Sequence, residues 1–251
     1  MDEPLHTEEL NVEKKDSSAF ASESRTFPGP LALFERSWDF YKGHFKDVTT
    51  VMLFPAALAV LFGLMLPHGV QGVGRVLIAL VEMFATLTLL FLITSRDAVT
   101  VMDSFKKALH NFLSYFWVTI IVCVLVVLGY ILFVIPGIIA SVWFSFSFIV
   151  FVVEVKRGFD AVKTSRSYVK GYWWPVFGRL LFLLVIAFGI GIAVGVSSFV
   201  FGFLPLLGKL LVLMCGAAFS VVFTPLSLIY LYFLYQEVKN FQHVAPSVKE
   251  A

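Results

Sequence analysis

The chain has 251 residues, of which 59% are hydrophobic and only 14% are charged. Soluble domains carry roughly 25% charged residues, so this composition argues against an ordinary soluble domain and indicates an integral membrane protein. The formal net charge of +2 excludes nothing by itself. The information lies in where the charges stand along the chain.

Residues 1–28 are polar and acidic, and we expect them to form a disordered tail. This segment lacks the apolar core of a signal peptide, so we expect the first membrane helix to direct insertion. Residues 29–240 are then the membrane domain, and residues 241–251 form a short C-terminal tail.

Long segments without Asp, Glu, Lys or Arg follow the tail, and the longest runs from Asn111 to Val153. A membrane helix needs about 20 apolar residues, so that segment is expected to hold two spans. Pro136 and Gly137 form the hairpin turn between them, because proline ends a helix and glycine tolerates a bend. The six expected spans are Val48–Leu66, Val76–Thr94, Tyr115–Ile135, Ile138–Val153, Leu180–Phe203 and Leu210–Tyr235.

An amphipathic segment precedes each pair of expected spans. Aromatic and apolar residues recur at helical spacing from Phe34 to Phe45, from Val101 to Phe112 and from Val162 to Trp173, and charged residues occupy the opposite faces. This pattern is typical of helices that lie in a membrane interface. The predicted fold is therefore an all-α integral membrane protein, with six transmembrane helices in three hairpins, each preceded by a cytoplasmic amphipathic helix.

The basic residues predict the orientation. With the N-terminus inside, only Arg75 and Lys209 of the 19 Lys and Arg residues fall on the outer side. Cytoplasmic loops carry an excess of Lys and Arg, so we expect both termini in the cytoplasm and the protein in the plasma membrane.

Glu82 is the one charged residue well inside an expected span, and an intramembrane carboxylate is a candidate functional site. Two interpretations stay open. Glu82 either binds a proton or cation in a transporter or channel component, or it is a neutral or hydrogen-bonded structural residue. Glu154 follows the fourth span beside Lys156 and Arg157, and we interpret it as an interface residue.

Two further sets of residues are candidates for contacts. Lys163, Arg166 and Lys170 follow one polar face and are expected to meet anionic lipid headgroups. Small residues let helix backbones approach one another, so Gly191, Gly195 and Gly216 are expected to mediate helix packing. That packing either joins the fifth and sixth spans or forms a homodimer seam.

No arrangement typical of catalysis is present in the sequence. It has no phosphate-binding loop, no nucleophile elbow and no zinc-binding helix motif. Cys123 and Cys215 fall in apolar segments and have no metal-ligand spacing. We therefore expect no enzymatic activity, no cofactor, no bound metal and no nucleic-acid partner.

One stretch of sequence has a resemblance. It contains Ile135-Pro136-Gly137-Ile138-Ile139, then Glu154, then a helix from Ala161 that closes on Lys170-Gly171-Tyr172-Trp173-Trp174. It resembles a bacterial family of multi-span proteins related to the glycerophosphoryl diester phosphodiesterase membrane domain, over roughly residues 100–240. The resemblance implies a six-helix domain of the bacterial inner membrane, mostly without an assigned activity. The catalytic barrel fused to some members has no counterpart in this chain.

The expected function is that of a non-enzymatic membrane scaffold or accessory protein that acts on partners or lipids at the inner leaflet. Membrane lipids are the expected partners, and protein partners or a homo-oligomer are possible. The alternative is a transporter or channel component that uses Glu82.

Overall fold

The computed structural model describes residues 27–65, 71–95, 100–201 and 205–247 of the chain, and these residues contain helices and no strand. The disordered tail predicted for residues 1–28 falls outside the described part except for Phe27 and Pro28. The helices are α2 Pro30–Gly43, α3 Phe45–Met65, α4 Gln71–Thr94, α5 Val101–Leu132, α6 Val134–Phe144, α7 Ser147–Val153, α8 Phe159–Val169, α9 Trp173–Phe201 and α10 Pro205–Ser247.

Six segments are long and apolar enough to cross a membrane, which confirms the predicted membrane fold. These segments are Phe45–Met65, Gly72–Thr94, Val101–Leu132, Val134–Val153, Trp173–Ser197 and Leu210–Gln242. The fourth combines α6 and α7 and is interrupted at Ser145 and Phe146, where the chain leaves the helix for one turn.

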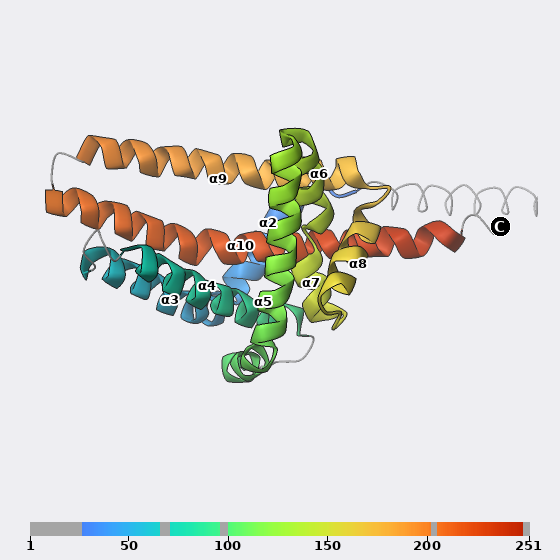
Figure 1. Ribbon diagram of the computed structural model, residues 1–251, viewed down its shortest axis with the longest axis horizontal. Helices are drawn as coiled ribbons and strands as arrows, with labels where there is room; N and C mark the ends of the chain where they lie inside the picture. The colour runs from blue at the N-terminus through green and yellow to red at the C-terminus, as the bar shows by residue number, and fades with distance from the viewer. Residues whose placement is uncertain (1–26, 66–70, 96–99, 202–204, 248–251) are drawn as a thin grey trace, which may run out of the picture.

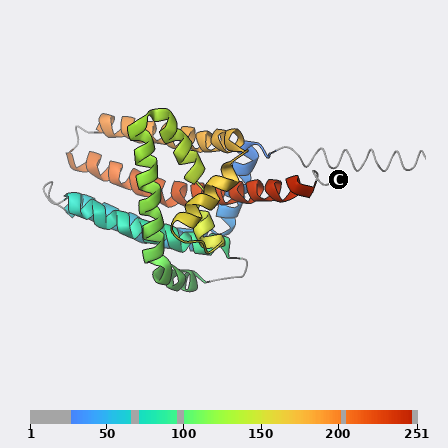
Figure 2. The same cartoon turned by 45° about the vertical axis from the view of Figure 1, so that its right-hand side comes forward.

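The helices run in two directions (Figure 1). α3, α4, α9 and α10 extend along the long axis of the molecule, whereas α5 runs across them. A second view keeps this crossed arrangement (Figure 2). The start of α2 and the end of α10 lie at the same end of the bundle as α8. The end of α3, the start of α4, the end of α9 and the start of α10 lie at the opposite end.

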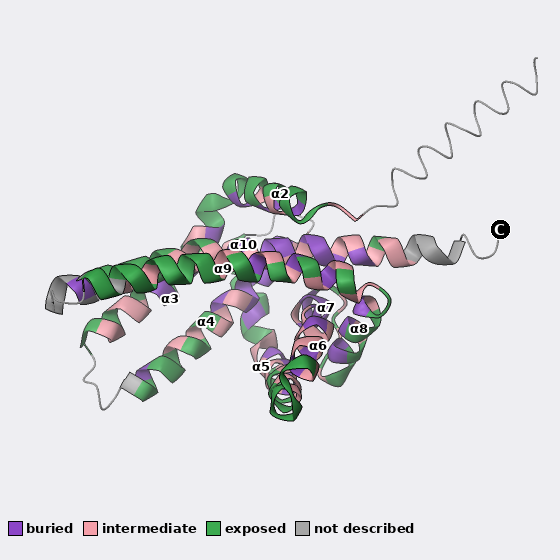
Figure 3. Cartoon of the chain, turned by 90° about the horizontal axis from the view of Figure 1, so that it is seen from above, coloured by how far each residue is buried: buried purple, intermediate pink, exposed green. Residues whose placement is uncertain are grey.

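The core lies near that first end, around the C-terminal half of α10 (Figure 3). Its largest fully buried side chains include Tyr230, Tyr235, Phe146 and Ile149. The outer half of α9 is different, because large apolar side chains such as Leu184, Phe188 and Phe199 are exposed along it. A soluble monomer rarely exposes such a continuous apolar face, and lipid chains are its natural surroundings.

The three amphipathic segments have different fates in the fold. α2 and α8 are separate helices, and proline at the start of α2 suits a first helical turn. The second segment is continuous with α5, which begins at Val101. Thr100 is the N-cap of α5, and its hydroxyl oxygen accepts a hydrogen bond from the backbone amide of Asp103 at 3.3 Å.

The turn between α5 and α6 lies three residues before the predicted one. The chain reverses at Phe133, where the backbone is extended, and Pro136 and Gly137 lie in the first turn of α6. Gly137 is needed for close packing and not for the bend, since a Cβ there would approach the ring of Tyr130 to 2.5 Å. The predicted hairpin turn at Pro136 and Gly137 is corrected in this respect.

The C-terminal boundary also differs from the prediction. The tail was expected from residue 241, yet α10 continues to Ser247. Phe241 stacks on Phe27 with ring centroids 4.1 Å apart, and Phe27 also meets the ring of Tyr172 at 5.4 Å. α10 thus continues past residue 240, and Phe27 packs against it.

Candidate functional site

The partly buried carboxylate of Glu154 holds the segment that follows α7. Oε1 of Glu154 accepts hydrogen bonds from the hydroxyls of Tyr168 at 2.5 Å and Tyr235 at 2.6 Å, and from Nζ of Lys239 at 3.1 Å. Oε2 pairs with Nζ of Lys156 at 3.0 Å. The side chain of Glu154 is only 12% exposed. We call these five residues the Glu154 cluster.

The electrostatics of the cluster keep Glu154 ionised at neutral pH. Burial raises the pKa of its carboxyl, but hydrogen bonds from Tyr168, Tyr235, Lys156 and Lys239 outweigh this effect and lower the pKa to about 2. Burial and the neighbouring carboxylate raise the pKa of Tyr168 to about 12, so its hydroxyl keeps the proton that it donates. The cluster thereby joins the end of α7 to α8 and α10.

The backbone next to the cluster has an unusual conformation. Val155 has a φ of 54°, in the left-handed region that β-branched residues avoid, and Gly158 has a φ of 55°. Glu154 and Lys156 are fixed on either side of Val155 by the bonds of the cluster. Val155 and Arg157 line a cavity that Glu154 does not line.

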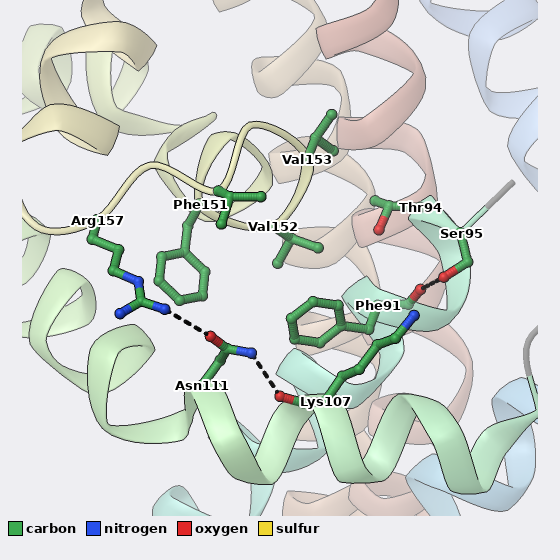
Figure 4. A pocket seen from close by; sticks show the side chains of 10 residues that line it. Phe91, Thr94, Ser95, Lys107, Asn111, Phe151, Val152, Val153 and Arg157 are labelled. Carbon is green, nitrogen blue, oxygen red and sulfur yellow. Dashed lines mark hydrogen bonds between the residues drawn. The ribbon is translucent and has the colours of Figure 1, made fainter.

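This cavity, of about 540 Å³, lies between the end of α4, the start of α5 and the segment after α7 (Figure 4). We call it the basic pocket. Its lining residues are Phe91, Thr94, Ser95, Lys107, Asn111, Phe151, Val152, Val153, Val155 and Arg157. A smaller hollow of about 240 Å³, lined by Leu113, Ser114, Trp117, Arg157 and Gly158, shares Arg157 with it.

The polar groups of the basic pocket favour an anion. Arg157 donates to the amide oxygen of Asn111 at 3.4 Å, and Asn111 donates to the carbonyl of Lys107 at 2.9 Å. The ammonium group of Lys107 has no hydrogen bond or ion pair with any described residue. The hydroxyls of Thr94 and Ser95 donate to carbonyls of their own helix, so Lys107 and Arg157 are the donors available to a ligand.

The charge balance and the floor of the pocket point to the same class of ligand. No acidic side chain is among its described lining residues. The rings of Phe91 and Phe151 and the side chain of Val152 form an apolar floor beside them. A group with an anionic head and an apolar body matches both surfaces. Within the described ranges, no three His, Cys, Asp or Glu side chains are placed to hold a metal ion.

Glu82 does not contribute to this site. It lies in the middle of α4 with its side chain exposed, and it has no hydrogen bond or ion pair within the part of the chain that the structure describes. It lines neither the basic pocket nor the adjoining hollow. Its role therefore stays a prediction.

The predicted headgroup contacts on α8 have exposed polar parts. Lys163 and Lys170 are exposed, and the guanidinium of Arg166 lies over the ring of Trp143 at 4.3 Å from its centroid. The apolar face of α8 packs inward, with Val162 and Val169 buried against the protein. Lipid contact by α8 would thus involve its cations and not its apolar face.

The predicted packing glycines do not contact a neighbouring helix. A Cβ at Gly191, Gly195 or Gly216 would meet no atom within 4 Å among the residues that are described. The expected packing of α9 on α10 through these glycines is therefore wrong for the single chain. Gly63 of α3 is a close contact instead, since a Cβ there would lie 2.6 Å from Leu213 of α10.

Sequence reasoning missed the importance of Glu154, which was interpreted as a residue of the interface. Its partners Tyr235 and Lys239 lie 81 and 85 positions along the chain. The available signal was an acidic residue directly after a charge-free segment, together with tyrosines in segments otherwise rich in leucine and phenylalanine. That signal does not say which tyrosines meet the carboxylate.

No family model, no curated protein and no solved structure matches the chain. The resemblance to the membrane domain associated with phosphodiesterases therefore stays an expectation, and the functional argument is drawn from the geometry.

Proposed function

We propose that the protein is a non-enzymatic accessory protein of the plasma membrane that binds anionic lipids at the inner leaflet. The observation that carries this proposal is the basic pocket, in which Lys107 and Arg157 lie beside an apolar floor and pair with no acidic side chain of the described residues. A lipid phosphate would accept hydrogen bonds from the ammonium and guanidinium groups. Its acyl chains would cover Phe91, Phe151 and the adjoining hollow at Trp117.

The position of the pocket supports the inner leaflet. Its lining residues come from the end of α4, the start of α5, and α7 with the segment after it. α7 lies beside α8, at the end of the bundle where α10 ends (Figure 1). That end carries most of the basic residues, which favours the cytoplasmic side. Reporter fusions at Leu10 and Ala245 test this orientation, and an external signal from either fusion contradicts it.

Lipid titration of the purified full-length protein tests the ligand class. We expect the Lys107→Ala and Arg157→Ala double variant to bind a short-chain anionic phospholipid more weakly, because two headgroup cations are lost at about 1 kcal/mol each, or roughly 30-fold together. The matched control is the Lys46→Ala and Lys106→Ala double variant, which removes the same charge from exposed positions outside the pocket.

The titration is made in uncharged micelles near physiological salt, where distant exposed charges are screened. We expect the control to bind nearly as tightly as the natural protein and a zwitterionic phospholipid to bind weakly. Inorganic phosphate should displace little lipid, because it cannot cover the apolar floor. Equal losses in both double variants, or no loss in the pocket variant, contradict the proposal.

The transporter alternative rests on Glu82 alone. The exposed position of this side chain on α4, outside the two hollows, gives that alternative no supporting contact. The lipid-binding proposal is preferred because several described side chains converge on its site.

A further inference from the structure

The α5–α6 hairpin has a different direction from the four long helices. α3, α4, α9 and α10 extend together along the molecule, and α5 runs across them in Figures 1 and 2. In Figure 3, a further view from above, α5 is seen nearly end-on. Helices that cross one bilayer side by side run roughly along the membrane normal. If α3, α4, α9 and α10 do so, α5 is strongly tilted from the normal.

Contacts between α8 and the end of α6 indicate how deep in the membrane α6 ends. The hydroxyl of Ser165 donates to the carbonyl of Trp143 at 2.8 Å and accepts from the amide of Phe146 at 3.1 Å. Arg166 also lies over the ring of Trp143. The outer face of α8 exposes Lys163 and Lys170, and such charges require water or headgroups. The end of α6 therefore lies near a polar membrane boundary.

The length of α6 limits how far the hairpin reaches from that boundary. α6 has 11 residues, which extend roughly 16 Å at about 1.5 Å per residue. The hydrocarbon core is about 30 Å thick. Even if α6 followed the membrane normal, the turn at Phe133 would stop near the centre of the bilayer. The crossed direction of α5 makes the depth smaller.

The tip of the hairpin is suited to acyl chains and not to water. Its five consecutive residues, Ile131 to Ile135, are each at least 64% exposed, and all are large and apolar. Gly129 and Gly137 hold the two helices close together behind it, since a Cβ at Gly129 would lie 3.0 Å from the Cα of Gly137. The tip is thus a narrow apolar end without a charged residue.

We propose that the α5–α6 hairpin enters the leaflet next to α2 and α8, turns at Phe133 and returns without crossing the membrane. Its partner is the layer of acyl chains of that one leaflet. Length and composition qualify six segments as spans, and the contacts of α8 make the second hairpin re-entrant while α3, α4, α9 and α10 cross. The proposal is independent of the basic pocket and leaves the predicted side of both termini unchanged.

Single cysteines in the full-length protein test this proposal after Cys123 and Cys215, both exposed, are replaced by alanine. Phe133→Cys probes the tip, Lys163→Cys probes α8, and Val73→Cys probes the start of α4 at the far end. A membrane-impermeant thiol reagent is applied from each side of sealed vesicles.

We expect reaction of Lys163→Cys from one side and of Val73→Cys from the other. Phe133→Cys should not be labelled from either side of the intact vesicles, and it should be labelled once detergent dissolves the membrane. Labelling of Phe133→Cys from the Val73 side would mean that the hairpin crosses, and labelling from the Lys163 side would mean that its tip lies in water. Either result overturns the proposal.

A nitroxide attached at Phe133→Cys distinguishes a tip at the bilayer centre from one just beneath the far headgroups. We expect high accessibility to oxygen and low accessibility to a polar nickel complex, as at a site in the hydrocarbon core. The same label at Val73→Cys is the control for the far boundary. Matching nickel accessibility at the two positions would contradict the re-entrant hairpin.

Discussion

Replacing Glu154 by glutamine tests whether the Glu154 cluster stabilises the junction of α7, α8 and α10. The amide is close in shape to a neutral carboxyl group, so the variant approximates Glu154 with its charge removed. The pKa of Glu154 is about 2 against an ordinary value of 4.5, and each pKa unit corresponds to about 1.36 kcal/mol. We therefore expect the free energy of unfolding to fall by about 3 kcal/mol at neutral pH.

The matched control is Glu237→Gln. Glu237 pairs with Arg36 at 3.2 Å on the surface of α2 and α10, where the Arg36 side chain is 56% exposed. Exposed ion pairs contribute about 0.2–1 kcal/mol, so this variant should lose much less. Both are measured by denaturant unfolding in micelles, followed by tryptophan fluorescence. Equal losses in Glu154→Gln and Glu237→Gln would refute the assigned importance of the cluster.

The same comparison has a defined pH dependence. The folded-state pKa of Glu154 is depressed, so its contribution to stability is complete above the unfolded pKa of 4.5 and disappears as the pH falls toward about 2. The advantage of the natural protein over Glu154→Gln should shrink across this range. An advantage that persists unchanged at pH 2 would contradict the ionised cluster.

Four further substitutions test other features. Gly137→Ala should destabilise the protein by about 1–3 kcal/mol in denaturant unfolding, because the added Cβ meets the Tyr130 ring. Its control, Gly191→Ala, places a Cβ in open space and should be neutral or slightly stabilising. Equal effects of the two substitutions would contradict the close packing at Gly137. Val155→Gly should raise or preserve thermal stability, since it relieves about 1–2 kcal/mol of left-handed strain against about 0.5–1 kcal/mol of added backbone entropy. Glu82→Gln should leave lipid binding and stability nearly unchanged, and a lost ion-dependent activity would favour transport instead.

The membrane segments could be predicted because a bilayer constrains each residue by its own polarity. Charge-free segments and flanking basic residues report that constraint directly, without knowledge of the tertiary contacts. The end points were less predictable, since Phe133 and not Pro136 makes the reversal. The spacing of glycines in the sequence also did not show which of them pack closely. Gly137 is packed against Tyr130, whereas Gly191 faces open space.

The Glu154 cluster and the basic pocket could not be predicted, because both depend on contacts between distant segments. Tyr235 reaches Glu154 from another helix, and Arg157 meets Asn111 across 46 positions. Side-chain hydrogen bonds of this kind depend on how the helices are placed relative to one another. The local periodicity of a sequence does not predict that placement. The break between α6 and α7 is similar, since its bonds come from Ser165 on α8.

The docking of Phe27 on Phe241 has a consequence for biosynthesis. The first described residues are translated early, yet their aromatic partner on α10 emerges only after nearly the whole chain has been made. α2 packs on α10 as well, and Arg36 finds its acidic partner there. The N-terminal segment is thus without its α10 neighbours until the last described helix has been made. A chain that ends before residue 241 would lack the Phe241 ring on which Phe27 stacks.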